Sequence, residues 1–134
     1  MIYMLDTNIC IYIINKQPEH IAKKFDELQD LGRIISVSSI VVSELQYGIE
    51  KSKYKEKNQE KVNKLLSKLE VIDFSESCAY FYGKIRSDLE SRGLSIGNND
   101  LFIASHAIEQ NAILITNNVS EFSRIENLKV ENIV

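Results

Sequence analysis

The chain has 134 residues, of which 44% are hydrophobic and 26% charged, close to the average for a soluble globular protein. This composition argues against a disordered chain, and the length predicts one domain spanning residues 1–134. The first residues lack the basic leader of a signal peptide, and no run of about 20 apolar residues predicts a membrane span. Cys10 and Cys78 stand in apolar stretches, which favours reduced, buried thiols and a cytoplasmic location.

The net charge is −3, which is unusual for a protein that binds nucleic acid, because phosphate binding normally requires a basic excess. The charge is unevenly spread: residues 51–68 contain seven lysines against Glu56 and Glu60, a local charge of +5. Two interpretations of this lysine run stay open. It is either a solvated helix face, the commoner case, or a patch that attracts phosphates.

Short apolar runs predict strands, and the longer amphipathic stretches between them predict helices. In chain order, strands are expected at 2–5, 34–37, 71–72, 113–115 and, at an edge, 128–130. Helices are expected over 7–15, 18–32, 38–48, 56–69, 75–93 and 98–111, with Thr7 or Asn8 capping the first. Strands that alternate with helices predict an α/β fold with a central parallel sheet, helices on both faces and right-handed crossovers.

Polar residues follow the predicted strands, at the edge where such sheets bind their ligands. Asp6 directly follows the first strand, Glu44 lies on the helix after the second, and Asn118 follows the fourth. Asp100 opens the helix that leads into the fourth strand. Three carboxylates at one edge repel one another unless a hard divalent cation neutralises them, and an all-oxygen site favours magnesium or manganese over zinc.

Each acid also has a simpler interpretation when taken alone. Asp6 could be a helix cap, although Thr7 and Asn8 could fill that role, and Asp100 could favour the first turn of its helix through the helix dipole. Glu44 could form a surface salt bridge. Its helical spacing from Val41 places it beside an apolar stripe, however, where an unpaired carboxylate costs several kcal/mol.

Other chemistries lack the residues that they need. The chain has no GxxxxGK[ST] phosphate loop and no GxGxxG motif. Nothing in the sequence brings His20 and His106 together as an acid–base pair, and both are interpreted as non-catalytic. A phosphatase that uses Asp6 as its nucleophile is the enzymatic alternative, but Asn8 stands where that class usually has a second acid.

Four motifs in order resemble those of the PIN-domain nucleases, and are most similar to the VapC toxins of bacterial toxin–antitoxin pairs. They are Leu5-Asp6-Thr7-Asn8, Ser43-Glu44-Leu45 with Gly48, Ile96-Gly97-Asn98-Asn99-Asp100-Leu101-Phe102-Ile103-Ala104, and Ile115-Thr116-Asn117-Asn118 with Glu121-Phe122. Any one of them is weak evidence, whereas four at this spacing, extending from Met4 to the end of the chain, are strong evidence.

The resemblance implies a three-layer α/β/α PIN fold and a magnesium-dependent endoribonuclease, with manganese as a substitute. It implies metal ligation by Asp6 and Asp100, with Glu44 acting directly or through water. Asn118 stands where many PIN domains have a fourth acid, so its amide oxygen would ligate the metal or orient water. A catalytically weak PIN-like RNA-binding module is the non-enzymatic alternative.

The resemblance also implies partners. It predicts a VapB-type antitoxin, a homodimer, and binding to operator DNA only through the antitoxin complex, with no membrane partner. The closing segment 116–125 resembles that of the VapC subgroup that cuts initiator tRNA in its anticodon loop.

Overall fold

A computed structural model describes residues 2–133, so that Met1 and Val134 lie outside the described residues. Its sheet has five parallel strands in the order β3-β2-β1-β4-β5. The strands are β1 (Ile2–Leu5), β2 (Ile34–Ser38), β3 (Glu70–Ile72), β4 (Ile113–Ile115) and β5 (Lys129–Glu131). The predicted α/β fold with a central parallel sheet is confirmed, and the edge strand lies one residue later than expected.

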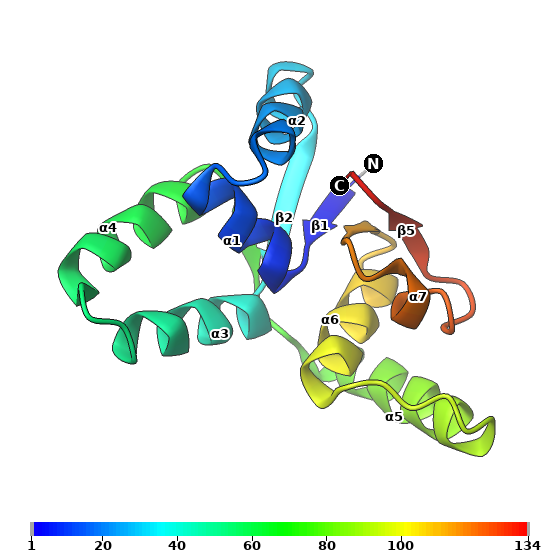
Figure 1. The fold of residues 1–134 in the computed structure, drawn as a ribbon. Helices are drawn as coiled ribbons and strands as arrows, with labels where there is room; N and C mark the ends of the chain where they lie inside the picture. The colour runs from blue at the N-terminus through cyan, green and yellow to red at the C-terminus, as the bar shows by residue number, and fades with distance from the viewer. Residues whose placement is uncertain (1, 134) are drawn as a thin grey trace.

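Helices cover both faces of this sheet. They are α1 (Thr7–Asn15), α2 (Glu19–Asp30), α3 (Ser39–Glu50), α4 (Lys55–Leu66), α5 (Glu76–Ser91), α6 (Asn98–Glu109) and α7 (Val119–Phe122). Strands β2 and β3 are added on one side of β1, and β4 and β5 are added on its other side. Right-handed crossovers therefore place the helices of the two halves on opposite faces. Figure 1 shows α1–α4 on one side of the strands and α5–α7 on the other.

The cap of α1 is the residue that the sequence left as an alternative to Thr7 and Asn8. Asp6 is the capping residue: its backbone is extended, and the backbone N–H of Ile9 donates to Asp6 Oδ1 at 3.0 Å. Because β1 ends at Leu5 and the helix begins at Thr7, Asp6 is the only residue between them and must supply the cap. This bond fixes the direction of the Asp6 side chain.

The core continues through α6, which is buried along most of its length. Leu101, Ile103, Ala104 and Ala107 are all at most 3% exposed, and α6 contacts both β4 and α5. A helix that is apolar on most of its surface is expected where it lies between a sheet and another helix. Its polar first turn, which includes Asp100, therefore lies at the margin of the core.

Strand register determines which residues meet at the carboxyl edge of the sheet. Leu5 of β1 is paired with Ile115 of β4, and the Asp6 N–H donates to the Ile115 carbonyl at 3.2 Å. Asp6 and Thr116 consequently leave the sheet side by side.

No helix within residues 2–133 has the length and apolar character needed to cross a membrane.

Candidate active site

Asp6 is a buried carboxylate at the end of the central strand, with only 5% of its surface exposed. Burial raises the pKa of Asp6 above its usual value, hydrogen bonds from Thr116 and from the N–H of Ile9 oppose that rise, and the charge of Glu44 adds to it. Asp6 therefore caps α1 and also belongs to a group of interacting acids.

Asp100 joins Asp6 from the first turn of α6. Its pKa is raised to about 6, first by burial, then by the charges of Glu121, Asp6 and Glu44, and by a hydrogen bond with Glu121. The charges of Glu121, Asp6 and Glu44 therefore reach Asp100, which places the four acids in one neighbourhood. The structure thus brings together Asp6, Glu44 and Asp100, the three acids singled out in the sequence.

Glu44 approaches this group from α3, beside a hollow of about 270 Å³ between α1, α3 and α4. Apolar side chains such as Ile11 and Leu45 line the hollow, and Lys61 of α4 lies at its wall. Gly48 lies one turn beyond Glu44 and also lines it, with open space where a side chain would begin. The placement of Glu44 beside an apolar stripe is therefore as expected, whereas the alternative of a surface salt bridge finds no support among the ion pairs of residues 2–133.

Asn118 does not stand alone in the position of a fourth acid. Its side-chain N–H group donates to Glu121 Oε2 at 3.0 Å, and its backbone N–H donates to Thr116 Oγ1 at 2.9 Å. The fourth acid of the group is Glu121, which was not among the residues assigned from the sequence. The available signal was an acid three residues after Asn118, but the four-residue helix α7 is too short to show helical periodicity.

The donor set of this group suits a hard cation. None of the ion pairs in the described part of the chain involves Asp6, Glu44, Asp100 or Glu121. All four offer oxygen atoms, which magnesium and manganese prefer. Magnesium is commonly held by only one or two carboxylates and keeps several waters, a requirement that Asp6 and Asp100 could meet.

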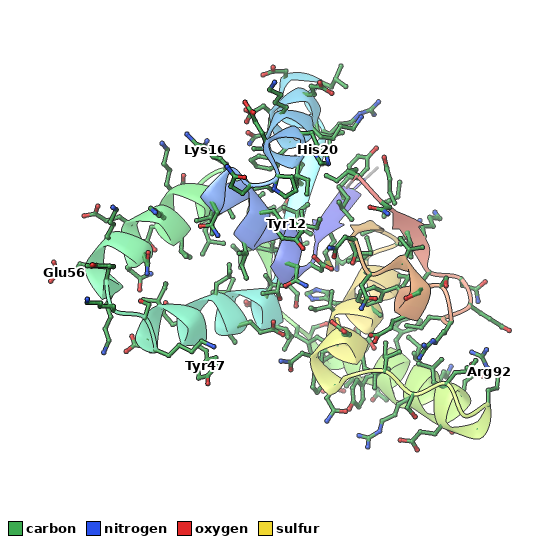
Figure 2. The ribbon with its side chains drawn as sticks, in the orientation of Figure 1. Tyr12, Lys16, His20, Tyr47, Glu56 and Arg92 are labelled. Carbon is green, nitrogen blue, oxygen red and sulfur yellow. The ribbon has the colours of Figure 1, made fainter. Side chains whose placement is uncertain are left out.

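The lysine run and the two histidines do not belong to this group. All seven lysines of residues 51–68 are exposed, and Lys61 reaches the hollow beside Glu44. In Figure 2, Glu56 marks the first turn of α4, and His20 lies on α2. His106 is buried against Ser38, so the structure does not bring the two histidines together.

Comparison with known proteins gives one consistent family. The PIN domain model matches residues 3–128. The chain is 58% identical to the ribonuclease VapC2 of Rickettsia felis over 98% of both chains, and 40% identical to the tRNA(fMet)-specific endonuclease VapC of Salmonella typhimurium over 97% of this chain and 96% of that one.

Solved structures agree with these relatives. The structure of VapBC2 from Rickettsia felis bound to a DNA fragment from its promoter is similar with a TM-score of 0.93, 56% identity and 98% coverage of both chains. That of VapBC-1 from nontypeable Haemophilus influenzae is similar with a TM-score of 0.89 and 39% identity, and covers 99% of this chain and 98% of that chain.

The raised pKa of Asp100 makes stability depend on pH. The carboxyl group holds its proton more tightly in the folded chain, at about 6, than at its usual 3.8, so the metal-free chain loses stability as the pH rises from about 4 through about 6. Asp100→Asn removes the charge and keeps the shape. Solvent reaches this half-buried group and weakens the repulsion, so the free energy gained is smaller than the full pKa shift implies. The variant should be about 1 kcal/mol more stable than the parent at pH 8 and equal to it near pH 4.

Urea unfolding in EDTA at the two pH values measures this difference. Asp26→Asn, at an exposed position on α2, is the matched control and should leave the pH dependence unchanged. A parent chain and an Asp100→Asn variant with identical pH dependence would show that the Asp100 carboxylate is not repelled by its neighbours.

Proposed function

The chain belongs to the PIN-domain family as a ribonuclease of the VapC type, and from that premise we propose that it is a metal-dependent endoribonuclease, the toxin of a toxin–antitoxin pair. The observation that carries this proposal is that the charges of Asp6, Glu44 and Glu121 reach Asp100 at the carboxyl edge of the sheet, while none of these acids forms an ion pair among residues 2–133. Such a group is costly to the fold unless a cation joins it, and it offers that cation only oxygen ligands.

Asp6 and Asp100 would hold Mg²⁺, with Mn²⁺ as a substitute. The bound ion lowers the pKa of water and stabilises the charge that develops on a phosphodiester. Asp6 is suited to ligation because its capping bond from Ile9 and the hydrogen bond from Thr116 fix its orientation before any ligand arrives. Preorganised ligands lose little entropy on binding.

Glu44 and Asp100 would act on the attacking water. Glu44 lies at the edge of an open hollow, from which it could orient a water molecule for in-line attack opposite the 3′ oxygen. Asn118 would position Glu121, because its side-chain N–H donates to Glu121, which in turn contacts Asp100. Its amide oxygen would ligate the metal or orient water. Attack by water in this geometry leaves a 5′-phosphate and a 3′-hydroxyl, and requires no pair of histidines.

The phosphatase alternative lacks the second acid that its class usually has two residues after the nucleophile. Asn8 is exposed, and the position offers no second acid.

We propose the anticodon loop of initiator tRNA as the substrate. The support comes from the relatives of Salmonella typhimurium and Shigella flexneri, 40% and 37% identical, which are named tRNA(fMet)-specific endonucleases. A single-stranded loop also suits a site at a sheet edge, because its backbone can be spread into an acidic pocket. The exposed lysine run, with Lys61 beside Glu44, favours its interpretation as a phosphate-attracting patch.

The partner that we propose is a VapB-type antitoxin, with operator DNA bound through the complex and with a homodimer of this chain at its centre. The solved relatives from Rickettsia felis and Salmonella typhimurium are VapBC assemblies bound to DNA. An antitoxin segment would bind in the apolar hollow beside Glu44 and cover the acidic group from there. Two free cysteines, Cys10 and Cys78, suit the reducing cytoplasm in which such pairs would act.

Asp6→Asn tests the metal-ligand assignment while keeping the helix cap, because asparagine caps helices as well as aspartate does. We expect RNA cleavage to fall by at least about 100-fold, as loss of several kcal/mol of charge stabilisation implies. The free energy of unfolding should be no lower than in the parent chain. Asp6→Ala loses the cap as well, at about 1 kcal/mol, and is therefore the less informative variant.

Single-turnover cleavage assays, together with circular dichroism to check folding, measure this effect. Asp26→Asn again serves as the control and should cleave at the parental rate. A folded Asp6→Asn chain with parental activity would remove Asp6 from the site.

The substrate proposal predicts where the RNA is cut in cells that express the chain. Primer extension should find a single strong stop in the anticodon loop of initiator tRNA, and this stop should be absent when the Asp6→Asn variant is expressed. Cuts confined to messenger or ribosomal RNA would contradict the proposed substrate but would still support ribonuclease activity.

A further inference from the structure

A second cluster of potential ligands lies between α5 and α6, apart from the acidic group. Cys78 in the first turn of α5 faces His106 and Glu109 near the end of α6, and the ligand atoms of these three residues all lie within 4.8 Å of one another. Among residues 2–133, this is the only set of three or more histidine, cysteine or acidic side chains that meet so closely. Neither the active-site chemistry nor the core packing accounts for this combination.

His106 provides an independent sign that the cluster is built for a ligand. Its side chain is fully buried, and its Nε2 atom has no hydrogen-bond partner among the described residues. The other ring nitrogen, Nδ1, lies 2.7 Å from Ser38 Oγ, which already accepts the backbone N–H of Ile40 at 3.1 Å. If Nδ1 donates its proton to the second lone pair of this hydroxyl, Nε2 keeps a free electron pair.

This arrangement is the one that proteins use to orient a metal-binding histidine. A ligating imidazole usually donates its second N–H to an oxygen that fixes the tautomer and the ring orientation. The ring is held further by Phe74, whose ring meets it edge-on at 5.7 Å between centroids, and Phe74 packs in the same way on Phe102. An isolated buried nitrogen without a partner is otherwise unfavourable.

Cys78 and Glu109 complete the donor set. The Cys78 thiol is fully buried, 3.7 Å from Glu109 Oε2 and 3.6 Å from the Ser75 hydroxyl. Glu109 is half-buried, which leaves a path from solvent, and Gln110 donates to its carboxylate at 2.8 Å. Burial lowers the pKa of His106 and so favours the neutral imidazole, while the charges of Glu109 and Asp73 oppose this shift.

We propose that Cys78, His106 and Glu109 bind Zn²⁺ and thereby tie α5 to α6. One sulfur, one nitrogen and one oxygen ligand suit zinc and are a poor set for magnesium. Zinc ligands at about 2.0–2.3 Å from the ion lie up to about 4 Å apart, so small side-chain rotations would close the observed spacing. Water or the Ser75 hydroxyl would take the fourth position. The site is independent of the proposed ribonuclease reaction.

Cobalt(II) tests this site because it replaces zinc and absorbs light when a thiolate binds it. The full chain, stripped with a chelator and kept reduced, should gain a thiolate-to-cobalt charge-transfer band at one equivalent of Co²⁺, and Zn²⁺ should remove the band. Cys78→Ser should abolish it. Cys10→Ser should retain the band, because Cys10 is the other buried thiol and lies outside the cluster. Asp100→Asn should also retain it, which separates this site from the acidic group.

Zinc binding measured by competition with a chromophoric chelator gives a second readout. Glu109→Gln, at a partly exposed position, should weaken Zn²⁺ binding at least about tenfold, and Ser38→Ala should weaken it about 10–100-fold through loss of the orienting hydroxyl. Either of two results would overturn the proposal. One is the absence of the cobalt band in the parent chain, and the other is a band and a zinc affinity that are unchanged in both Cys78→Ser and Glu109→Gln.

Discussion

In the centre of the sheet, Leu5 of β1 is held in register with Ile115 of β4, and the arrangement of the acidic group depends on that pairing. Because the strands are parallel, the pairing brings both chain segments out at the same edge, with Asp6 beside Thr116. A slip of one residue would turn Asp6 to the opposite face of the sheet. The buried side chains Met4, Leu5 and Leu114 make such a slip costly, so the hydrophobic core itself fixes the position of the acid.

The acidic group lowers the free energy of unfolding that the core provides. Asp6 and Asp100 both have raised pKa values, which means that their charged forms are disfavoured in the folded chain. Asp6 offsets part of this cost by capping α1, so that one side chain serves the fold and the proposed chemistry together. Crowded carboxylates that are retained despite their repulsion are typical of sites that act on a cation or a substrate.

Hydrophobic patterning predicted most of the fold. Six of the seven helices and all five strands are where apolar periodicity placed them, to within a few residues, because each element buries one face. The short helix α7 was missed, since four residues cannot display a period of 3.6. The cap of α1 was assigned to Thr7 or Asn8, with Asp6 as the simpler alternative, because all three neighbouring residues suit a cap and the sequence does not show which of them begins the helix.

The site was predicted less completely than the fold. The rule that ligands bind at the carboxyl ends of strands named Asp6, Glu44 and Asp100, and the charges of these three acids act on one another in the structure. Their roles in metal binding and catalysis stay a prediction. The rule did not identify Glu121, because this residue lies on α7 and joins the group through a hydrogen bond from Asn118. The cluster of Cys78, His106 and Glu109 was equally invisible, since its members come from two helices whose packing cannot be read from local sequence.

The central claim is that the acidic group hydrolyses RNA by means of a divalent metal ion, and the chemical ends of the products test it most directly. Purified chain and an initiator tRNA transcript should be incubated with Mg²⁺ and with excess EDTA, and the end groups of the fragments determined. The account predicts 5′-phosphate and 3′-hydroxyl ends, no cleavage in EDTA, and recovery with Mg²⁺ or Mn²⁺. A 2′,3′-cyclic phosphate end, or undiminished cleavage in EDTA, would contradict it.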